Sequence, residues 1–110
     1  MKLLPGSLLI KGDVSKETDV KEMIEKTVSH FGSIDVLVNN AGISVVNLLT
    51  DTTLEEWEKL FSINVTGTFL ASKYAAKEMI KNHSGKIINI SSIWGVSGAC
   101  MESCYSASKG

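Results

Sequence analysis

Three short apolar runs alternate with three segments of helical periodicity, and this order constrains the fold more than any other feature of the sequence. The apolar runs predict buried strands at residues 7–14, 34–38 and 86–91. The intervening segments predict helices over residues 15–31, 53–81 and from Ser103 onward. Apolar strands joined by helices form parallel sheets that helices cover on both faces. The alternation therefore predicts an α/β fold with residues 1–110 in a single domain.

Local signals predict where the helices begin and end. Ser15 is expected to be the N-cap of the first helix, and Gly32 the residue that ends it. Thr53 followed by Glu56 is a capping box, which predicts the start of the second helical region. We expect a break in that region near Asn64.

Composition and charge argue against several classes of function. Lys and Arg (11) nearly balance Asp and Glu (12), and no basic stripe indicates binding to nucleic acid or to an anionic membrane. No apolar stretch is long enough to span a bilayer, and the first residues do not form a signal peptide. Cys100 and Cys104 are too few for a disulfide framework or a metal site. We expect a soluble, cytoplasmic protein with free thiols and no metal.

Tyr105 and Lys109 are the strongest local signal for chemistry. A spacing of four on a helix puts the phenol and the ammonium group on one face. A neighbouring cation stabilises a phenolate, which a tyrosine needs in order to exchange a proton near neutral pH. The pair alone also fits a solvated helix face, because this spacing is common by chance.

Polar residues follow each predicted strand. Ser92 ends the third strand, while Gly12-Asp13-Val14 and Asn39-Asn40-Ala41-Gly42 end the first and second. Ligands bind beyond the carboxyl ends of strands in open α/β sheets, so these residues are expected to face one crevice. The alternative is structural: Ser92 can satisfy its own backbone, and the other two motifs can simply shape turns.

Together these motifs resemble the short-chain dehydrogenase/reductase family, and the match covers essentially the whole chain. The resemblance implies a Rossmann-like doubly wound parallel sheet and a carbonyl reduction that depends on a nicotinamide cofactor. Tyr105 matches the general acid/base of the family. Lys109 matches the lysine that holds the nicotinamide ribose and lowers the pKa of the tyrosine. Ser92 orients and polarises the substrate carbonyl. Asn64 anchors a water molecule in the proton relay.

The resemblance also assigns residues to cofactor binding, and it shows that one motif of the family is missing from the sequence. Asp13 matches the residue that meets the adenine ring, with Val14 beside it, and Asn40, Ala41 and Gly42 match the turn against the adenosine ribose. NADP(H) is expected more than NAD(H). The Gly-rich phosphate-binding turn of the family has no counterpart in the sequence. We therefore expect the central part of an NAD(P)-binding domain, marginally stable and inactive as a 110-residue piece.

The substrate and the assembly are expected from the resemblance alone. The sequence is most similar to bacterial 3-oxoacyl-(acyl-carrier-protein) reductases. Trp94, Cys100 and Glu102 also resemble a subgroup that reduces a 5-aminopentanone group on elongation factor P, although packing roles explain them equally well. A non-catalytic dinucleotide-binding or scaffold protein is the alternative of another class. In the family, the helix over about 64–81 and the helix near Ser103 pack on a second subunit, which implies a homodimer or homotetramer.

Overall fold

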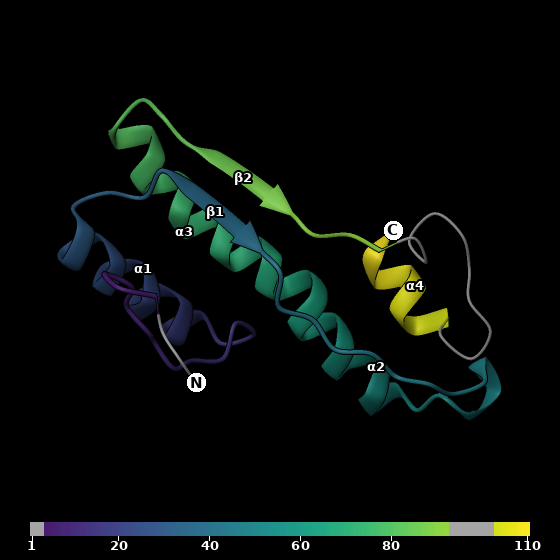
Figure 1. Cartoon of the computed structure of the whole chain (residues 1–110). Helices are drawn as coiled ribbons and strands as arrows, with labels where there is room; N and C mark the ends of the chain where they lie inside the picture. Colours follow the sequence, from purple (N-terminus) through teal and green to yellow (C-terminus); the bar gives the residue numbers. More distant parts are fainter. Residues whose placement is uncertain (1–3, 93–102) are drawn as a thin grey trace.

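The computed structural model describes residues 4–92 and 103–110. Within them, helices and strands follow one another along the chain as shown in Figure 1. The elements are α1 (Glu17–Phe31), β1 (Val36–Asn39), a 3₁₀ turn η1 (Leu49–Asp51), α2 (Leu54–Phe61), a π-helical turn η2 (Ser62–Thr66), α3 (Gly67–Lys81), β2 (Lys86–Asn89) and α4 (Ser103–Lys109).

The sheet of the described residues consists of β1 and β2, which run parallel as the sequence predicts. Their register pairs Val36 with Lys86 and Asn39 with Asn89. At the carboxyl end of the pair, Asn39 Nδ2 donates to Asn89 Oδ1 at 2.8 Å and to Ser72 Oγ of α3 at 3.1 Å. This side-chain network ties both strand ends to the helix behind them.

The prediction of a strand at residues 7–14 is wrong. These residues form no ladder with another strand in the described part of the chain, and a turn closes at its end, where Lys16 N donates to Asp13 O at 3.0 Å. Strand geometry needs a hydrogen-bonding neighbour, because an isolated extended segment leaves its backbone groups unpaired. Leu9 is 64% exposed, so an apolar run by itself does not bury this segment.

The N-cap of helix α1 (Glu17–Phe31) lies one residue later than predicted. Lys16 is the N-cap and makes no side-chain capping bond, whereas the Ser15 hydroxyl donates to Asp13 Oδ1 at 2.6 Å. Ser15 is therefore part of the preceding turn, and the prediction that it caps the helix is wrong. The prediction for Gly32 is confirmed: its φ is 91°, and its N–H donates to Val28 O at 2.8 Å.

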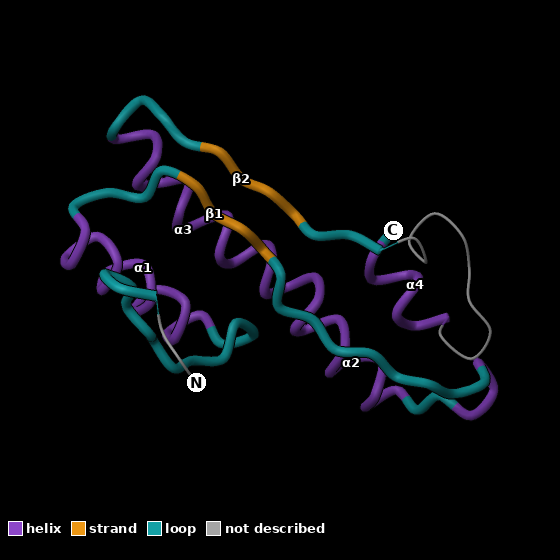
Figure 2. Tube along the Cα trace, viewed as in Figure 1, coloured by secondary structure: helices purple, strands orange, loops and turns teal. Residues whose placement is uncertain are grey.

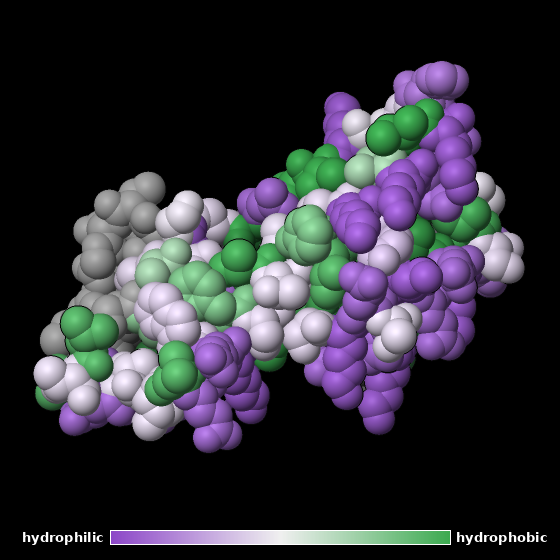
Figure 3. All heavy atoms as spheres, turned by 180° about the vertical axis from the view of Figure 1, so that it is seen from behind, coloured by the Kyte–Doolittle hydropathy of each residue, from purple (hydrophilic) through white to green (hydrophobic). Residues whose placement is uncertain are grey.

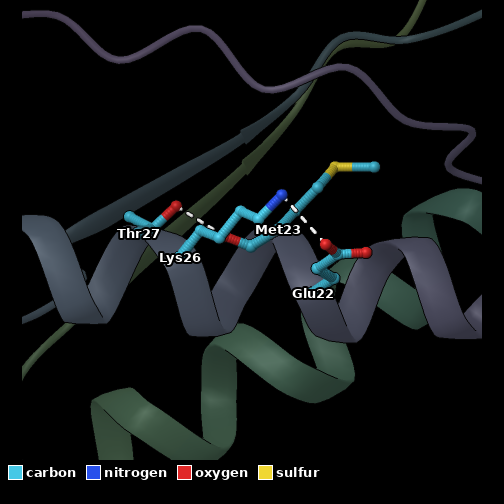
Figure 4. Close-up of polar contacts among 4 residues, drawn as sticks. All are labelled: Glu22, Met23, Lys26 and Thr27. Carbon is cyan, nitrogen blue, oxygen red and sulfur yellow. Dashed lines mark hydrogen bonds and ion pairs between the residues drawn. The ribbon is translucent and has the colours of Figure 1, made fainter.

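Helix α1 makes side-chain contacts within itself on both its exposed and its partly buried side (Figure 4). Lys26 and Glu22 form an exposed ion pair at 2.9 Å, one turn apart, and the partly buried Thr27 hydroxyl donates to Met23 O at 2.7 Å. The exposed ion pair contributes only about 0.3–0.5 kcal/mol. The position of α1 is therefore set by its apolar side.

The long helical region begins and breaks where the sequence predicts. Thr53 Oγ1 accepts a hydrogen bond from Glu56 N at 3.1 Å, which confirms the N-cap. The predicted break is the π-helical turn η2, which contains Asn64. A π-turn inserts one extra residue into a helix and leaves local carbonyls without their usual partners. The hydroxyl of Thr68 donates to Asn64 O at 3.1 Å and satisfies one of these carbonyls.

The core lies between α1, α3 and the sheet, which Figure 2 shows as adjacent layers. α3 packs on both α1 and β1. Ile34, Ala75 and Met79 are buried at the centre, with Ile24, Val28 and Leu37 partly buried around them. Val36 and Val38 alternate with Leu37 along β1 and are about half exposed. The face of β1 away from the core is therefore apolar and accessible.

The far side of the molecule mixes apolar and charged areas (Figure 3). Hydrophobic side chains lie on the surface between hydrophilic ones in this view from behind. The exposed apolar residues of the long helical region include Leu54, Val65, Phe69 and Ile80. Within residues 4–92 and 103–110, no helix has both the length and the apolar character needed to cross a membrane.

Candidate active site

A cleft of about 400 Å³ lies beyond the carboxyl ends of β1 and β2. Parallel strands bring their ends to the same edge of the sheet, so residues far apart in sequence meet there. Three of the four predicted catalytic residues line this cleft. Its lining is Asn40, Gly42, Ile43, Ser44, Ile90, Ser91, Ser92, Tyr105 and Lys109.

Helix α4 carries two of the predicted catalytic side chains and is attached to the end of β2. Lys109 Nζ donates to Ile90 O at 3.1 Å, and Ser91 Oγ donates to Lys109 O at 2.7 Å. Tyr105 lies one turn earlier on the same helix and lines the same cleft as Lys109, which agrees with the predicted shared face. Ser92 lines that cleft from the β2 side. The structure thus brings the predicted phenol, ammonium and hydroxyl groups together.

Asn64 lies beside the cleft and is buried, with 5% of its surface exposed. Its Oδ1 accepts from Ile43 N at 2.8 Å, while its Nδ2 donates to Ile43 O at 2.9 Å and to Ser108 Oγ at 3.0 Å. Both N–H groups of the amide are therefore used. Asn64 connects the loop after β1 to α4, and we call this set of contacts among Ile43, Asn64 and Ser108 the Asn64 junction.

Gly42 lies where the loop after β1 meets α4. A Cβ at this position would lie 3.4 Å from both Lys109 Nζ and Asn64 Oδ1, which is ordinary van der Waals contact. The contact of Gly42 with a cofactor stays a prediction.

The predicted cofactor residues divide between two neighbouring clefts. Asn40 and Gly42 line the cleft that contains Tyr105, and Asn40 also lines a second cleft of about 410 Å³ together with Ala41 and Val14. Leu8, Leu9 and Ile10 contribute to the apolar wall of this second cleft. The two clefts share Asn40, so a long ligand can contact both along the sheet edge.

Asp13 lines neither cleft and instead organises the turn before α1. Its Oδ1 accepts hydrogen bonds from the Ser15 hydroxyl and from Ser15 N, and these hold the pKa of the Asp13 carboxyl below its ordinary value of 3.8. Asp13 N donates to Asp19 Oδ2 at 2.9 Å. The contact of Asp13 with a cofactor stays a prediction.

Cys104 is the one cysteine that the structure describes, and its thiol is free and buried. Burial raises the pKa of this thiol above its ordinary value of 9.0, and the charge of Glu56 raises the pKa further. Cys104 therefore packs α4 in its protonated form. Cys100 falls outside the described residues, as do Trp94 and Glu102.

The sequence alone did not reveal Ser108 and Thr68 as parts of the site. Ser108 lies within the Tyr105–Lys109 segment, but its partner Asn64 is 44 residues away in sequence. Thr68 completes the hydrogen bonding of the π-turn. A single sequence carries no spacing signal for such contacts. In the described residues, no group of three or more His, Cys, Asp or Glu side chains could hold a metal ion.

Comparison with known proteins identifies the family. The family model described as short chain dehydrogenase matches residues 5–110. The chain therefore belongs to the short-chain dehydrogenase/reductase family, and the predicted Rossmann-like α/β class with a doubly wound parallel sheet is confirmed.

The relatives are longer proteins. An uncharacterized oxidoreductase of Thermotoga maritima is 46% identical over 101 residues, which are 92% of this chain and 40% of the relative. A 3-oxoacyl-(acyl-carrier-protein) reductase of Synechocystis is 41% identical over 103 residues, 94% of this chain and 42% of the relative. The solved structure of ElxO with NADP bound has a TM-score of 0.86 and 46% identity, over 91% of this chain and 41% of ElxO. The chain spans about two fifths of the length of these relatives.

Proposed function

We propose that this protein is an NAD(P)(H)-dependent oxidoreductase that reduces a carbonyl group to an alcohol. The observation that carries the proposal is the shared cleft of Ser92, Tyr105 and Lys109 at the carboxyl ends of two parallel strands. A hydroxyl, a phenol and an ammonium group there suit a reaction in which an oxygen becomes negatively charged and takes up a proton.

The residues of the two clefts fit a nicotinamide dinucleotide. When bound, the cofactor supplies the hydride that the protein's own side chains cannot provide. Lys109 and Asn40 offer donors for ribose hydroxyls, and Gly42 leaves room for close backbone approach. Val14 and Ala41 would contact the adenosine end, with Asp13 near the adenine. The NADP bound to ElxO supports NADP(H) over NAD(H) for this chain.

Each side chain of the cleft then has a separate task. Tyr105 donates its phenolic proton to the carbonyl oxygen as that oxygen becomes an alkoxide, and Ser92 donates a hydrogen bond to the same oxygen. Lys109 holds the ribose and stabilises the phenolate that remains on Tyr105. The Asn64 amide is already bonded to Ile43 and Ser108. Its Oδ1 and its backbone carbonyl each accept one hydrogen bond, so each oxygen keeps a lone pair for a water that Asn64 would anchor.

For the substrate, we propose a 3-oxoacyl thioester or a similar ketone. Relatives from Synechocystis and Staphylococcus epidermidis that carry the name 3-oxoacyl-(acyl-carrier-protein) reductase support this choice. Reduction of a 5-aminopentanone group is the alternative ketone chemistry, and the three residues that suggested it lie outside the described part of the chain. The cytoplasmic location remains a prediction.

The test compares the two tyrosines of the chain, assayed with NADPH and 3-oxoacyl thioesters in the full-length protein. We expect Tyr105→Phe to lower kcat on the order of 100-fold or more, because the proton donor is lost. Tyr74→Phe is the matched control: Tyr74 lies on α3 with its ring near Lys73 and Lys77, outside the cleft. Full turnover in Tyr105→Phe would contradict the proposed role of this site. A non-catalytic scaffold would show no turnover in either variant or in the wild type.

We further propose that the full-length protein is a homo-oligomer that buries the exposed apolar side of α2 and α3. Phe69 is 60% exposed, and Leu54, Val65 and Ile80 are exposed on the same helical region. Exposed apolar patches of this kind mark interaction surfaces. Light scattering of Phe69→Glu should report a smaller particle than wild type, whereas Glu25→Gln on the exposed surface of α1 should not change the mass. An unchanged mass for Phe69→Glu would contradict this interface.

A further inference from the structure

We propose that Ser108 is a positioning residue that fixes Tyr105 and Lys109 over the cleft through Asn64, an inference that rests on the proposed function. Ser108 lies between the two catalytic side chains on α4. Its hydroxyl donates to Tyr105 O at 2.7 Å and accepts from Asn64 Nδ2 at 3.0 Å. One hydroxyl is therefore used as donor and acceptor at once.

The direction of these bonds explains why a hydroxyl is needed. Donation to Tyr105 O, three residues back in the helix, orients the Ser108 hydroxyl so that its lone pairs remain available to Asn64. Asn64 accepts from Ile43 N and donates to Ile43 O with its remaining groups. The result is one hydrogen-bond chain from the loop after β1, through the π-turn, to the backbone of Tyr105. Hydrogen bonds arranged in series polarise and strengthen one another.

Side chains attach helix α4 (Ser103–Lys109) to the rest of the described structure at several points. The last turn is attached to β2 through Lys109 and Ser91, and Cys104 is buried in the packing near α2. Ser108 adds the attachment to the loop that carries Asn40 and Gly42. It therefore relates the two sides of the cleft to each other.

Precise placement matters because hydride and proton must reach adjacent atoms of one carbonyl. A displacement of about 1 Å can lower a reaction rate on the order of 100-fold. Loss of the Ser108 hydroxyl leaves one Asn64 N–H unpaired in a buried place, so the amide and Ile43 are expected to shift. The effect should therefore fall on kcat more than on KM.

The experiment compares Ser108→Ala with Ser106→Ala in the full-length protein. Ser106 is the matched control because it lies on the same helix, and its Oγ is buried without a hydrogen-bond partner in the structure. We expect Ser108→Ala to lower kcat roughly 10- to 100-fold with KM changed less than about threefold. Ser106→Ala should leave both near wild type. Ser108→Thr, which keeps the hydroxyl, should restore part of kcat.

Amide hydrogen exchange gives a second readout that does not require turnover. Ile43 N–H should exchange faster in Ser108→Ala than in Ser106→Ala, because its acceptor Asn64 Oδ1 is less firmly held. Equal Ile43 exchange and equal kcat in the two variants would overturn the proposal for Ser108. The function itself fails separately, if Tyr105→Phe keeps full turnover. In that case the exchange comparison still decides whether Ser108 holds the junction.

Discussion

The Asn64 junction and the N-terminal segment, residues 4–14, lie in the same chain but are held in different ways. At the junction, side chains from distant segments satisfy one another with hydrogen bonds of 2.8–3.0 Å around a buried amide. The N-terminal segment is richer in apolar residues, but Leu8 and Leu9 remain exposed and no ladder forms. Side-chain contacts can complete a polar site locally, whereas an apolar strand requires a neighbouring strand.

The largest difference should appear between a leucine of α2, the helix that leads into the π-turn of Asn64, and a leucine of the N-terminal segment. Leu60 of α2 is fully buried, whereas Leu9 is 64% exposed. We expect Leu60→Ala to lower the free energy of unfolding by about 2–5 kcal/mol, because it removes buried methyl groups and leaves a cavity. Leu9→Ala should cost less than about 0.5 kcal/mol. Urea unfolding measures both values. Equal losses would mean that the N-terminal segment is as well packed as α2.

The next effect concerns the junction itself. Asn64→Ala removes three hydrogen bonds and leaves Ile43 N and O without their partner, so we expect a loss of about 2–3 kcal/mol in the free energy of unfolding. Asn82→Ala is the control, because Asn82 ends α3 on the exposed surface and its backbone bonds persist in the variant. If the two substitutions destabilise the protein equally, the buried hydrogen bonds of Asn64 add nothing beyond a surface amide.

A smaller effect should appear where the N-terminal segment does contact the helices. A Cβ on Gly67 would lie 2.8 Å from Val14 Cγ2 and 3.3 Å from Val14 O. We expect Gly67→Ala to destabilise the protein by about 1–2 kcal/mol through this overlap. In the background of Val14→Ala, the cost should fall, since the closest atom is gone. A constant cost in both backgrounds would show that Val14 does not pack on α3 in this way.

The smallest effect is electrostatic and belongs to the turn that follows the N-terminal segment. The Ser15 hydroxyl is the main cause that lowers the Asp13 pKa below 3.8. Because the folded pKa is the lower one, the stabilisation by ionised Asp13 is present above pH 3.8 and is lost as the pH falls through the folded pKa. An NMR titration should show the Asp13 pKa rising in Ser15→Ala and unchanged in Ser29→Ala. An unchanged pKa in Ser15→Ala would contradict the hydrogen bond.

The sequence predicted those parts of the fold whose causes are local. The Thr53 cap, the Gly32 helix end and the break near Asn64 each follow from a few neighbouring residues, and the structure confirms them. Ser15 was misplaced because Asp13 competes for its hydroxyl. The strand at 7–14 was predicted from apolar character alone, which does not report whether a neighbouring strand is present.

The site was predictable to a similar degree. Ser92, Tyr105 and Lys109 were placed at strand ends and on one helix face, and the structure brings them to one cleft. Asn64 lies beside this cleft, where hydrogen bonds to residues of other segments hold its side chain. Those partners, Ile43 and Ser108, could not be inferred because contacts between distant segments depend on tertiary packing. The catalytic roles of all four residues remain proposals.

The most direct test of the central claim follows a deuterium atom. Full-length protein is given a 3-oxoacyl thioester and NADPH that carries deuterium at the transferable position of nicotinamide C4. Our account predicts that one deuterium appears on the new alcohol carbon, and that this transfer is lost in Tyr105→Phe but kept in Tyr74→Phe. An alcohol formed without deuterium at that carbon, or unchanged transfer in Tyr105→Phe, would contradict the account.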